Sequence, residues 1–457
     1  MRRILLALFG LMAAACRGPE PAPIPAVFAQ IPADDRLLVV FVPGVTGSVL
    51  KDAESGEILW GTGRQLLVPR DGGYALARSI HQPVGGAPAA GRVRVETPDI
   101  LRVIRLGGGR KKIYQPLVDL FERAGFAEGD LSRPEAGGTF FPFPYDWRQD
   151  NVASAQRLQV ALEGLRRTRQ QDRLVVALVC QSNGASICRY FSRYGGASLA
   201  AAEAGRADHD PGLEIRGMVF IGTANGGSLR ILREVDRGRT YLPLVGRTQH
   251  PEVLFTFPSL YQELPDYRSD FFLDDEGKPV KANLWQAANW EKWQWSVFAP
   301  EAAKRLARQE RPDLFGNLEQ RRAFLKDQLA RARRFRTLLR QGPAAAPVPP
   351  IFMVQNAYRE TPDRAVLRPL RKAPKGLRWR AHFTGDRWLR RQSYLRFRTS
   401  APGDDHATRA SQLWLSAAET AALAAEPFYV RGGHFEMILE PAAERRLLEF
   451  LAEIATP

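Results

Sequence analysis

The stretch that decides the fold is VVALVCQSNGASICRYF, residues 175–191. It begins with an apolar run over residues 175–179, which predicts a buried strand. A short polar turn over residues 180–184 follows, with Ser182 at its centre. The apolar residues after the turn recur at helical spacing, and a pair of glycines at 195–196 closes this segment. A strand, a tight turn with a central serine and a helix together form the setting in which a serine is exposed as a nucleophile.

The turn departs from the usual G-x-S-x-G pattern at one position. Cys180 stands where the first glycine is usual, and Gly184 keeps the second. Both places require small residues because the strand and the helix cross closely around the serine, and cysteine is small enough to fit. The alternative is an ordinary serine at the start of a helix, so the rest of the chain has to decide.

Apolar strands and amphipathic helices alternate along the chain. We expect strands within residues 36–44, 212–228 and 349–358, a strand or turn at 140–148, helices over 113–126 and 151–170, and a short strand, a loop and a final helix within 426–454. This alternation predicts an α/β fold, with a mostly parallel sheet and helices on both of its faces.

Two regions interrupt the alternation. Residues 49–112 look irregular, and residues 229–345 read as an insertion that forms a cap or lid over a site. Four tryptophans, at positions 285, 290, 293 and 295, concentrate in the insertion. They form either the core of the cap, which we favour for most of them, or a contact surface for an apolar substrate.

The N-terminus has the pattern of an export signal. A basic start precedes a 12-residue apolar run over residues 4–15, which is too short for a comfortable membrane span. The run ends at Cys16, as in bacterial lipoprotein signal peptides, so we expect residues 1–15 to be removed and Cys16 to carry lipid. An ordinary signal peptide, cut after Ala15 or at another small residue, is the alternative. Residues 16–33 then read as a Pro/Ala-rich tether, and residues 34–457 as the folded domain.

Composition narrows the classes of partner. The chain has 457 residues, 45% of them hydrophobic, and a formal net charge of +16. Positive charge favours either nucleic acid or anionic lipid surfaces, and export together with the lack of a nucleic-acid motif favours the lipid surface. The charge is densest over residues 321–340, which we expect to form an amphipathic helix with a solvated basic face.

Cysteine usage and ligand spacing point to no cofactor. We expect Cys180 and Cys188 to be buried, reduced residues, because a disulfide between the strand end and the helix would conflict with the geometry of the turn. No C-x-x-C or H-E-x-x-H spacing suggests a metal. We therefore predict an active site without a metal or an organic cofactor.

A serine hydroxyl needs a histidine base and a carboxylate that orients the histidine. His434 lies in the loop between the expected last strand and the final helix, where folds of this type place the base. The acid should lie between residue 356 and His434. Asp404 is our first choice, Asp405 the second and Asp386 the weakest, because turn aspartates often serve only the turn.

Acyl transfer also needs donors for the developing oxyanion. One is the backbone amide after the nucleophile, here that of Asn183. The loop VPGVTGS, residues 42–48, follows an early strand and supplies the other, from Thr46 or its neighbour Val45. We expect Gly44 and Gly47 to provide unusual backbone angles in this loop.

Several separate stretches together resemble the lecithin:cholesterol acyltransferase-like family of α/β hydrolases, across roughly residues 36–450. They are VPGVTGS (42–48), PYDWR (144–148), CQSNGAS (180–186), GTANGGS (222–228) and APGDDHATRAS (401–411). Cys180 and Gln181 depart from the family's G-H-S-x-G turn, and Asp405 replaces a glycine in its acid loop. PYDWR is the most specific match. The resemblance aligns Ser182, Asp404 and His434 with the catalytic triad of the family.

The resemblance implies acyl transfer from a glycerolipid ester through an acyl-serine intermediate, to water or to another alcohol. Within PYDWR we expect an ion pair between Asp146 and Arg148, with Trp147 packed beside it. Two other functions remain open: a general serine esterase for smaller soluble esters, and an inactive lipid-binding lipoprotein. The lipid anchor implies a place in the bacterial envelope beside a membrane surface, with the outer membrane or the periplasmic face preferred.

Overall fold

The computed structural model describes residues 37–455, except 68, 70, 83–93, 107–108, 242–248, 310, 342–346, 371–377, 385, 393–394 and 396–397. The expected signal peptide, Cys16 and the tether lie outside the described residues. Those expectations therefore stay predictions.

The core is a six-stranded sheet in the order β16-β11-β9-β8-β1-β7, and every neighbouring pair in it runs parallel. Its strands are β1 (Leu38–Val42), β7 (Phe140–Pro142), β8 (Leu174–Gln181), β9 (Leu213–Ile221), β11 (Ile351–Gln355) and β16 (Phe428–Tyr429). The parallel sheet predicted from the alternation is confirmed.

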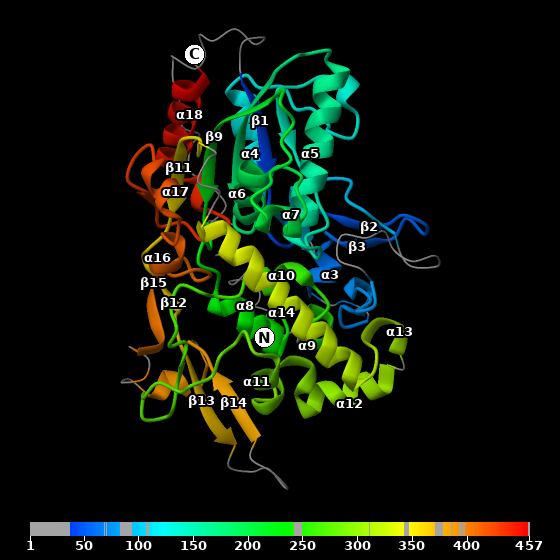
Figure 1. Cartoon of the computed structure of the whole chain (residues 1–457), viewed down its shortest axis with the longest axis vertical. Helices are drawn as coiled ribbons and strands as arrows, with labels where there is room; N and C mark the ends of the chain where they lie inside the picture. The colour runs from blue at the N-terminus through cyan, green and yellow to red at the C-terminus, as the bar shows by residue number, and fades with distance from the viewer. Residues whose placement is uncertain are drawn as a thin grey trace, which may run out of the picture.

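Successive side chains of a strand point to opposite faces, so a strand buried along its length is covered on both sides. All five residues of β1 and all five of β11 are buried. The helices that flank the sheet are α4 (Gln115–Arg123), α5 (Asn151–Thr168), α6 (Gly184–Tyr194) and α18 (Pro441–Ala455). The continuous apolar runs in the sequence thus reflect a sheet that is sandwiched between helices (Figure 1).

Parallel strands bring their carboxyl ends to one edge of the sheet. In Figure 1 the arrow of β1 points toward the half of the molecule that holds α8 to α14, so this edge faces the insertion. The helices there are α8 (Leu229–Arg237), α9 (Pro251–Leu254), α10 (Pro258–Gln262), α11 (Ala287–Lys292), α12 (Pro300–Gln309), α13 (Pro312–Phe315) and α14 (Leu318–Gln341). That the insertion at residues 229–345 functions as a cap stays a prediction.

The tryptophans of the insertion are mostly internal. Trp290 and Trp295 pack edge to face at 5.7 Å between ring centroids, and Trp293 is 4% exposed. Trp290 also contacts Tyr261. The favoured interpretation, in which most of these rings form the insertion's own core, is confirmed.

Small elements surround the central sheet. Residues 49–112 are not irregular as expected: they hold β2 (Leu50–Asp52), β3 (Ile58–Trp60), α3 (Gly63–Leu67), a 3-10 turn η2 (Tyr74–Leu76), β4 (Val95–Glu96), β5 (Val103–Leu106) and β6 (Gly109–Lys112). Further elements are α7 (Leu199–Glu203), β10 (Phe272–Leu273), β12 (Arg359–Pro362), β13 (Ala365–Leu370), β14 (Arg378–His382), β15 (Ser400–Gly403), α16 (Arg409–Gln412) and α17 (Ala417–Ala421). These strands pair in two- and three-stranded sheets.

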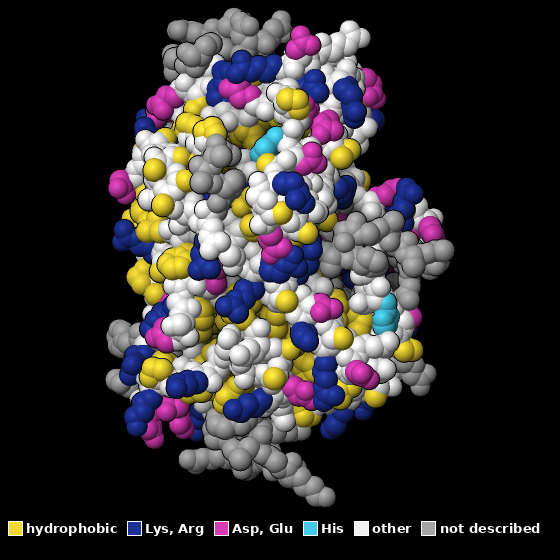
Figure 2. Space-filling model, in the orientation of Figure 1, with side chains coloured by type: hydrophobic (Ala, Val, Ile, Leu, Met, Phe, Trp, Pro, Cys, Tyr) yellow, Lys and Arg dark blue, Asp and Glu magenta, His cyan; other side chains and the backbone are white. Residues whose placement is uncertain are grey.

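The basic segment at residues 321–340 lies within α14, and the expected amphipathic helix is confirmed. Its apolar side is buried, including Leu325, Leu329 and Phe335. Its arginines are largely paired with acids: Arg322 with Glu291, Arg331 with Asp150, Arg334 with Glu203 and Arg336 with Asp266. Figure 2 shows Lys and Arg side chains interspersed with Asp and Glu over this face. Among the described residues, no helix is both long and apolar enough to cross a membrane.

Candidate active site

Ser182 lies in a sharp turn between β8 and α6, at the carboxyl edge of the sheet. Its φ is 53°, a left-handed conformation that is uncommon for a residue with a side chain. A Cβ atom at Gly184 would collide with the carbonyl oxygen of Val42, so the second glycine of the motif is required by the close approach of β1. Strand, strained turn and helix thus have the geometry predicted from the sequence.

Cys180, in the place of the first glycine, is bonded to Cys188 in a disulfide. The expectation that both cysteines are buried is correct, since each is 0% exposed, but the expectation that they are reduced is wrong. The turn reverses the chain so that the first turns of α6 pass beside the end of β8. The two Cα atoms are 6.7 Å apart, which is within the range that a disulfide spans. The bridge therefore ties the helix to the strand around Ser182.

Three side chains from distant parts of the chain meet at this turn. The Nε2 atom of His434 lies 3.0 Å from Ser182 Oγ, and its Nδ1 atom lies 2.8 Å from Asp404 Oδ2. His434 is 5% exposed and Asp404 is fully buried, while Ser182 is half-buried. This chain of contacts can carry a proton from the serine hydroxyl to the imidazole and can stabilise the imidazolium by a buried carboxylate.

Backbone amides hold the Asp404 carboxylate in place. Its Oδ1 accepts from the amide of His406 at 2.8 Å and from the amide of Ala407 at 2.6 Å, which leaves Oδ2 directed at His434. The two alternative acids are engaged elsewhere. Asp405 is exposed and pairs with Arg230, and Asp386 pairs with Arg237.

The change from glycine to aspartate at position 405 has a visible consequence. Asp405 has a φ of 75°, a conformation that glycine adopts freely and that aspartate tolerates better than most residues. Its amide donates to Thr361 Oγ1 at 2.9 Å, which fixes the turn. The acid loop thus keeps the backbone that a glycine would allow.

The predicted oxyanion donors lie around the same turn. Thr46 is buried with a φ of 67°, and its carbonyl accepts from Trp60 Nε1 at 2.9 Å. In the part of the chain that the structure describes, the amides of Val45, Thr46 and Asn183 donate to no other protein group. All three amides are thus available to an oxyanion, and the choice between Thr46 and Val45 stays open.

Gly44 and Gly47 of the 42–48 loop are glycines for a different reason from the expected one. Neither Gly44 nor Gly47 has a positive φ. A Cβ on Gly44 would lie 2.6 Å from Gln181 Oε1 and 2.7 Å from Ser182 Cβ, and one on Gly47 would lie 2.7 Å from Pro43 Cβ. They are glycines because the loop passes close to its neighbours, above all to the serine turn.

Gln181, which sequence reasoning noted only as a departure from the family motif, connects three loops. Its Oε1 accepts from the amide of Gly44 at 3.1 Å and from the Tyr114 hydroxyl at 2.8 Å, and its Nε2 donates to the carbonyl of His434 at 3.4 Å. Its position beside the nucleophile was the only signal in the sequence.

The PYDWR segment supports the residue after the nucleophile. Asn183 Nδ2 donates to the Tyr145 hydroxyl at 3.0 Å, and this hydroxyl donates to the carbonyl of Pro43 at 3.0 Å. The expected ion pair is confirmed, because Arg148 Nε lies 2.8 Å from Asp146 Oδ1. Trp147 is fully buried, and its Nε1 donates to the carbonyl of Ser48.

His406 was not identified from the sequence as a site residue. Its ring stacks on that of His434 with 4.0 Å between centroids, and its buried Nδ1 has no hydrogen-bond partner among the described residues. Burial, and then the nearby His434, lower the pKa of His406 well below its ordinary value, so it is neutral at neutral pH. Ligand atoms of Asp404, His406 and His434 lie within 4.8 Å of one another, as in metal sites, although His434 Nδ1 and Asp404 Oδ2 already contact each other. The expectation of a metal-free site stays a prediction.

Glu263 contacts α6, the helix that follows Ser182, and its burial makes the stability of the fold depend on pH. It accepts from Ser186 Oγ of α6 at 2.6 Å and is 4% exposed, and burial raises its pKa from 4.5 to about 7. A carboxyl whose pKa is raised on folding stabilises the fold at low pH and loses this contribution as the pH rises from 4.5 through 7. We expect Glu263→Gln to increase the free energy of unfolding at pH 8 by roughly 1–3 kcal/mol relative to wild type.

Urea unfolding at pH 4.5 and pH 8 checks this expectation. The difference between Glu263→Gln and wild type should be small at the lower pH and should grow at the higher. A Gln variant that is equally destabilised at both values would contradict the shifted pKa.

Comparisons with known proteins add evidence on the fold. No protein-family model and no curated protein sequence matches the chain. The chain is similar to a solved structure described as "The crystal structure of Tle4-Tli4 complex", with a TM-score of 0.54 and 14% sequence identity over 92% of this chain and 98% of that chain. At this identity the likeness concerns the fold alone.

Proposed function

We propose that the chain is a serine acyl hydrolase or O-acyltransferase that acts on lipid esters of the glycerophospholipid type through an acyl-serine intermediate. The observation that carries this proposal is the contact chain from Asp404 through His434 to Ser182, next to free amides at a strained turn. The choice of lipid esters rests on the resemblance to the lecithin:cholesterol acyltransferase-like family.

In the first half of the reaction, Ser182 Oγ attacks the ester carbonyl carbon while His434 Nε2 takes the hydroxyl proton. The resulting oxyanion accepts hydrogen bonds from the amides of Asn183 and of Thr46 or Val45. The carbon–oxygen bond to the alcohol then breaks, and His434 returns the proton to the departing alkoxide. The acyl group remains on Ser182.

In the second half, water or an acceptor alcohol gives its proton to His434 Nε2 and attacks the acyl carbonyl carbon. The tetrahedral intermediate collapses, and Ser182 Oγ leaves with the proton from His434. Throughout, Asp404 accepts the hydrogen bond from His434 Nδ1 and stabilises the imidazolium. A lipid on Cys16 would hold the site beside a membrane, which is the source of its substrate.

The first test is labelling of the purified chain with a fluorophosphonate, which reacts only with an activated serine. We expect labelling of wild type and loss of labelling in Ser182→Ala, because no other serine among the described residues has the histidine and carboxylate contacts of Ser182. Ser198→Ala, an exposed helix-capping serine, is the matched control and should still be labelled.

Absence of labelling in the folded wild type, with detergent present, would overturn the proposal and favour the inactive lipid-binding protein. Chain-length preference on ester substrates then separates the two enzymatic functions. Turnover that rises when the substrate becomes a dispersed phospholipid supports the lipid enzyme, and equal turnover of short soluble esters supports the general esterase.

A further inference from the structure

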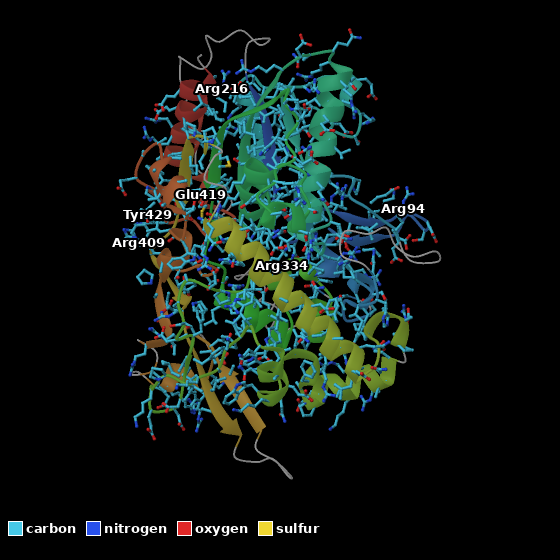
Figure 3. The ribbon with its side chains drawn as sticks, viewed as in Figure 1. Arg94, Arg216, Arg334, Arg409, Glu419 and Tyr429 are labelled. Atoms are coloured by element: carbon cyan, nitrogen blue, oxygen red, sulfur yellow. A yellow bond between two sulfur atoms is a disulfide. The ribbon has the colours of Figure 1, made fainter. Side chains whose placement is uncertain are left out.

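A cavity of about 1180 Å³ is lined in part by Pro144, Asp146 and Arg148 of the PYDWR segment, and Ser182, Asp404 and His434 do not line it. Its walls come from β2 and β3, from the residues around η2, from the segment after β7, from α5 and from residues 309–314. Figure 3 labels Arg94 on this side of the molecule, and Arg94 is one of the lining residues.

A buried arginine with an unused hydrogen-bond donor lines the cavity. Arg78 is 6% exposed, and its Nη2 atom has no hydrogen-bond partner among the described residues. Burial lowers the pKa of Arg78 to about 10, so the guanidinium keeps its charge at neutral pH. A buried cation without a hydrogen-bonded counter-charge is costly, and an anion bound in the cavity would relieve that cost.

Asp146 and Asp150 attract the Arg78 guanidinium electrostatically, but among the described residues neither one forms a hydrogen bond with its Nη2 atom. Arg148 holds Asp146 with two contacts of 2.8 Å, so this carboxylate already has a partner. The other acids that line the cavity also have hydrogen-bond donors of their own, except Glu57, which is exposed to solvent. Four of these acids accept hydrogen bonds from groups nearby in the sequence: Asp52 from the amides of Glu54 and Ser55, Asp71 from the amide of Gly73, Asp130 from Ser132 and Arg133, and Asp313 from Arg311.

A second cation and an unused acceptor lie in the same cavity. Arg157, on α5, is exposed and has no ion pair within the described part of the chain. The side-chain oxygen of Gln149 is buried and accepts no hydrogen bond from the described residues. An anion that also carries a proton would satisfy both Arg78 and Gln149. Inorganic phosphate and phosphate monoesters have this combination at neutral pH, because their second ionisation lies at about pH 6–7, whereas sulfate and phosphodiesters have no proton to donate.

From this juxtaposition we propose that the cavity is a binding site for a phosphate group, held by Arg78 and Arg157, with Gln149 accepting a hydrogen bond from the phosphate proton. Leu59, Phe143 and Val160 also line the cavity and leave room for an apolar group next to the phosphate. The phosphate could therefore come from free phosphate or from the monoester headgroup of a lipid such as phosphatidate. This proposal is independent of the proposed chemistry at Ser182.

The test measures binding of inorganic phosphate, sulfate and monomeric dihexanoyl phosphatidate to the full chain by titration calorimetry and by the shift in thermal unfolding. We expect saturable binding of phosphate or phosphatidate that is weakened about 10- to 100-fold in Arg78→Gln and at least several-fold in Arg157→Gln. Sulfate should bind more weakly than phosphate.

Arg216→Gln is the matched control, because it removes one positive charge from a side chain that pairs with Glu214 and does not line the cavity. It should leave binding unchanged, as should Ser182→Ala. Arg157 is exposed, so its variant keeps the test valid if Arg78→Gln fails to fold.

Each outcome has a defined meaning. Binding of phosphate alone supports the site with free phosphate as a sufficient ligand, and binding that requires phosphatidate supports the lipid headgroup as the source. Failure of both ligands to bind, binding that persists unchanged in both arginine variants, or equal binding of sulfate would overturn the assignment. Because Ser182 does not line the cavity, a failure to bind phosphate would overturn this proposal without contradicting the proposed hydrolase function.

Discussion

Asp404→Asn should lower kcat for ester hydrolysis by about 10⁴-fold, with little change in the free energy of unfolding. The carboxylate accepts from His434 Nδ1 and so sets the imidazole tautomer in which Nε2 can receive the Ser182 proton. An asparagine can present its amide NH₂ to Nδ1, which moves the imidazole proton to Nε2. His434 then cannot act as a base, although the amides of Asn183 and of Thr46 or Val45 remain.

The same loop offers a matched control in Asp405→Asn. Asp405 is exposed and pairs with Arg230, so we expect its substitution to change kcat by less than about tenfold. Steady-state hydrolysis of a chromogenic ester measures both variants, and their urea unfolding curves check that both are folded. Equal losses in the two variants, or a larger loss in Asp405→Asn, would remove Asp404 from the role that we propose for it.

The sequence predicts the central sheet because β1, β8, β11 and the second half of β9 are mostly apolar runs. β1 and β11 are buried along their whole length and β8 over seven of its eight residues, and runs of apolar residues are typical of parallel strands that are covered on both faces. The strands β12 and β15 have the sequences RETP and SAPG, which carry no strand pattern. They form because they pair with each other beside the sheet, and pairing at long range is invisible in a local window.

The site residues, like the strands, could be predicted where the local sequence is informative and could not where long-range contacts decide. Ser182 and His434 stand at strand ends, where position in the fold is informative, and the structure brings them to 3.0 Å from each other. The disulfide between Cys180 and Cys188 was not predicted, because it depends on how α6 crosses β8 and not on the spacing of the two cysteines. The unused Nη2 donor of Arg78 has no signature in the local sequence either, because the fold alone decides which groups surround an arginine.

Glu419→Gln should lower the free energy of unfolding by about 3–5 kcal/mol. Glu419, on α17, receives Arg189 through two contacts of 2.7 and 2.8 Å and Arg193 at 2.7 Å, and the three side chains are 1–4% exposed. Figure 3 labels Glu419. Burial alone would raise the pKa of Glu419, but the two arginines outweigh it and lower the pKa to about 2. A neutral glutamine would leave two buried guanidinium groups without a counter-charge.

Urea unfolding at neutral pH measures this loss, with Glu291→Gln as the control for an exposed pair. Glu291 contacts Arg322 at the surface, and such pairs contribute less than about 1 kcal/mol. Because folding lowers the pKa of Glu419, its contribution is complete above pH 4.5 and declines as the pH falls toward 2, so the difference between wild type and variant should shrink on acidification. Equal stability of Glu419→Gln and wild type at neutral pH would contradict this account. Since Arg189 and Arg193 both lie on α6, the loss also measures how firmly the helix that follows Ser182 is held to the rest of the fold.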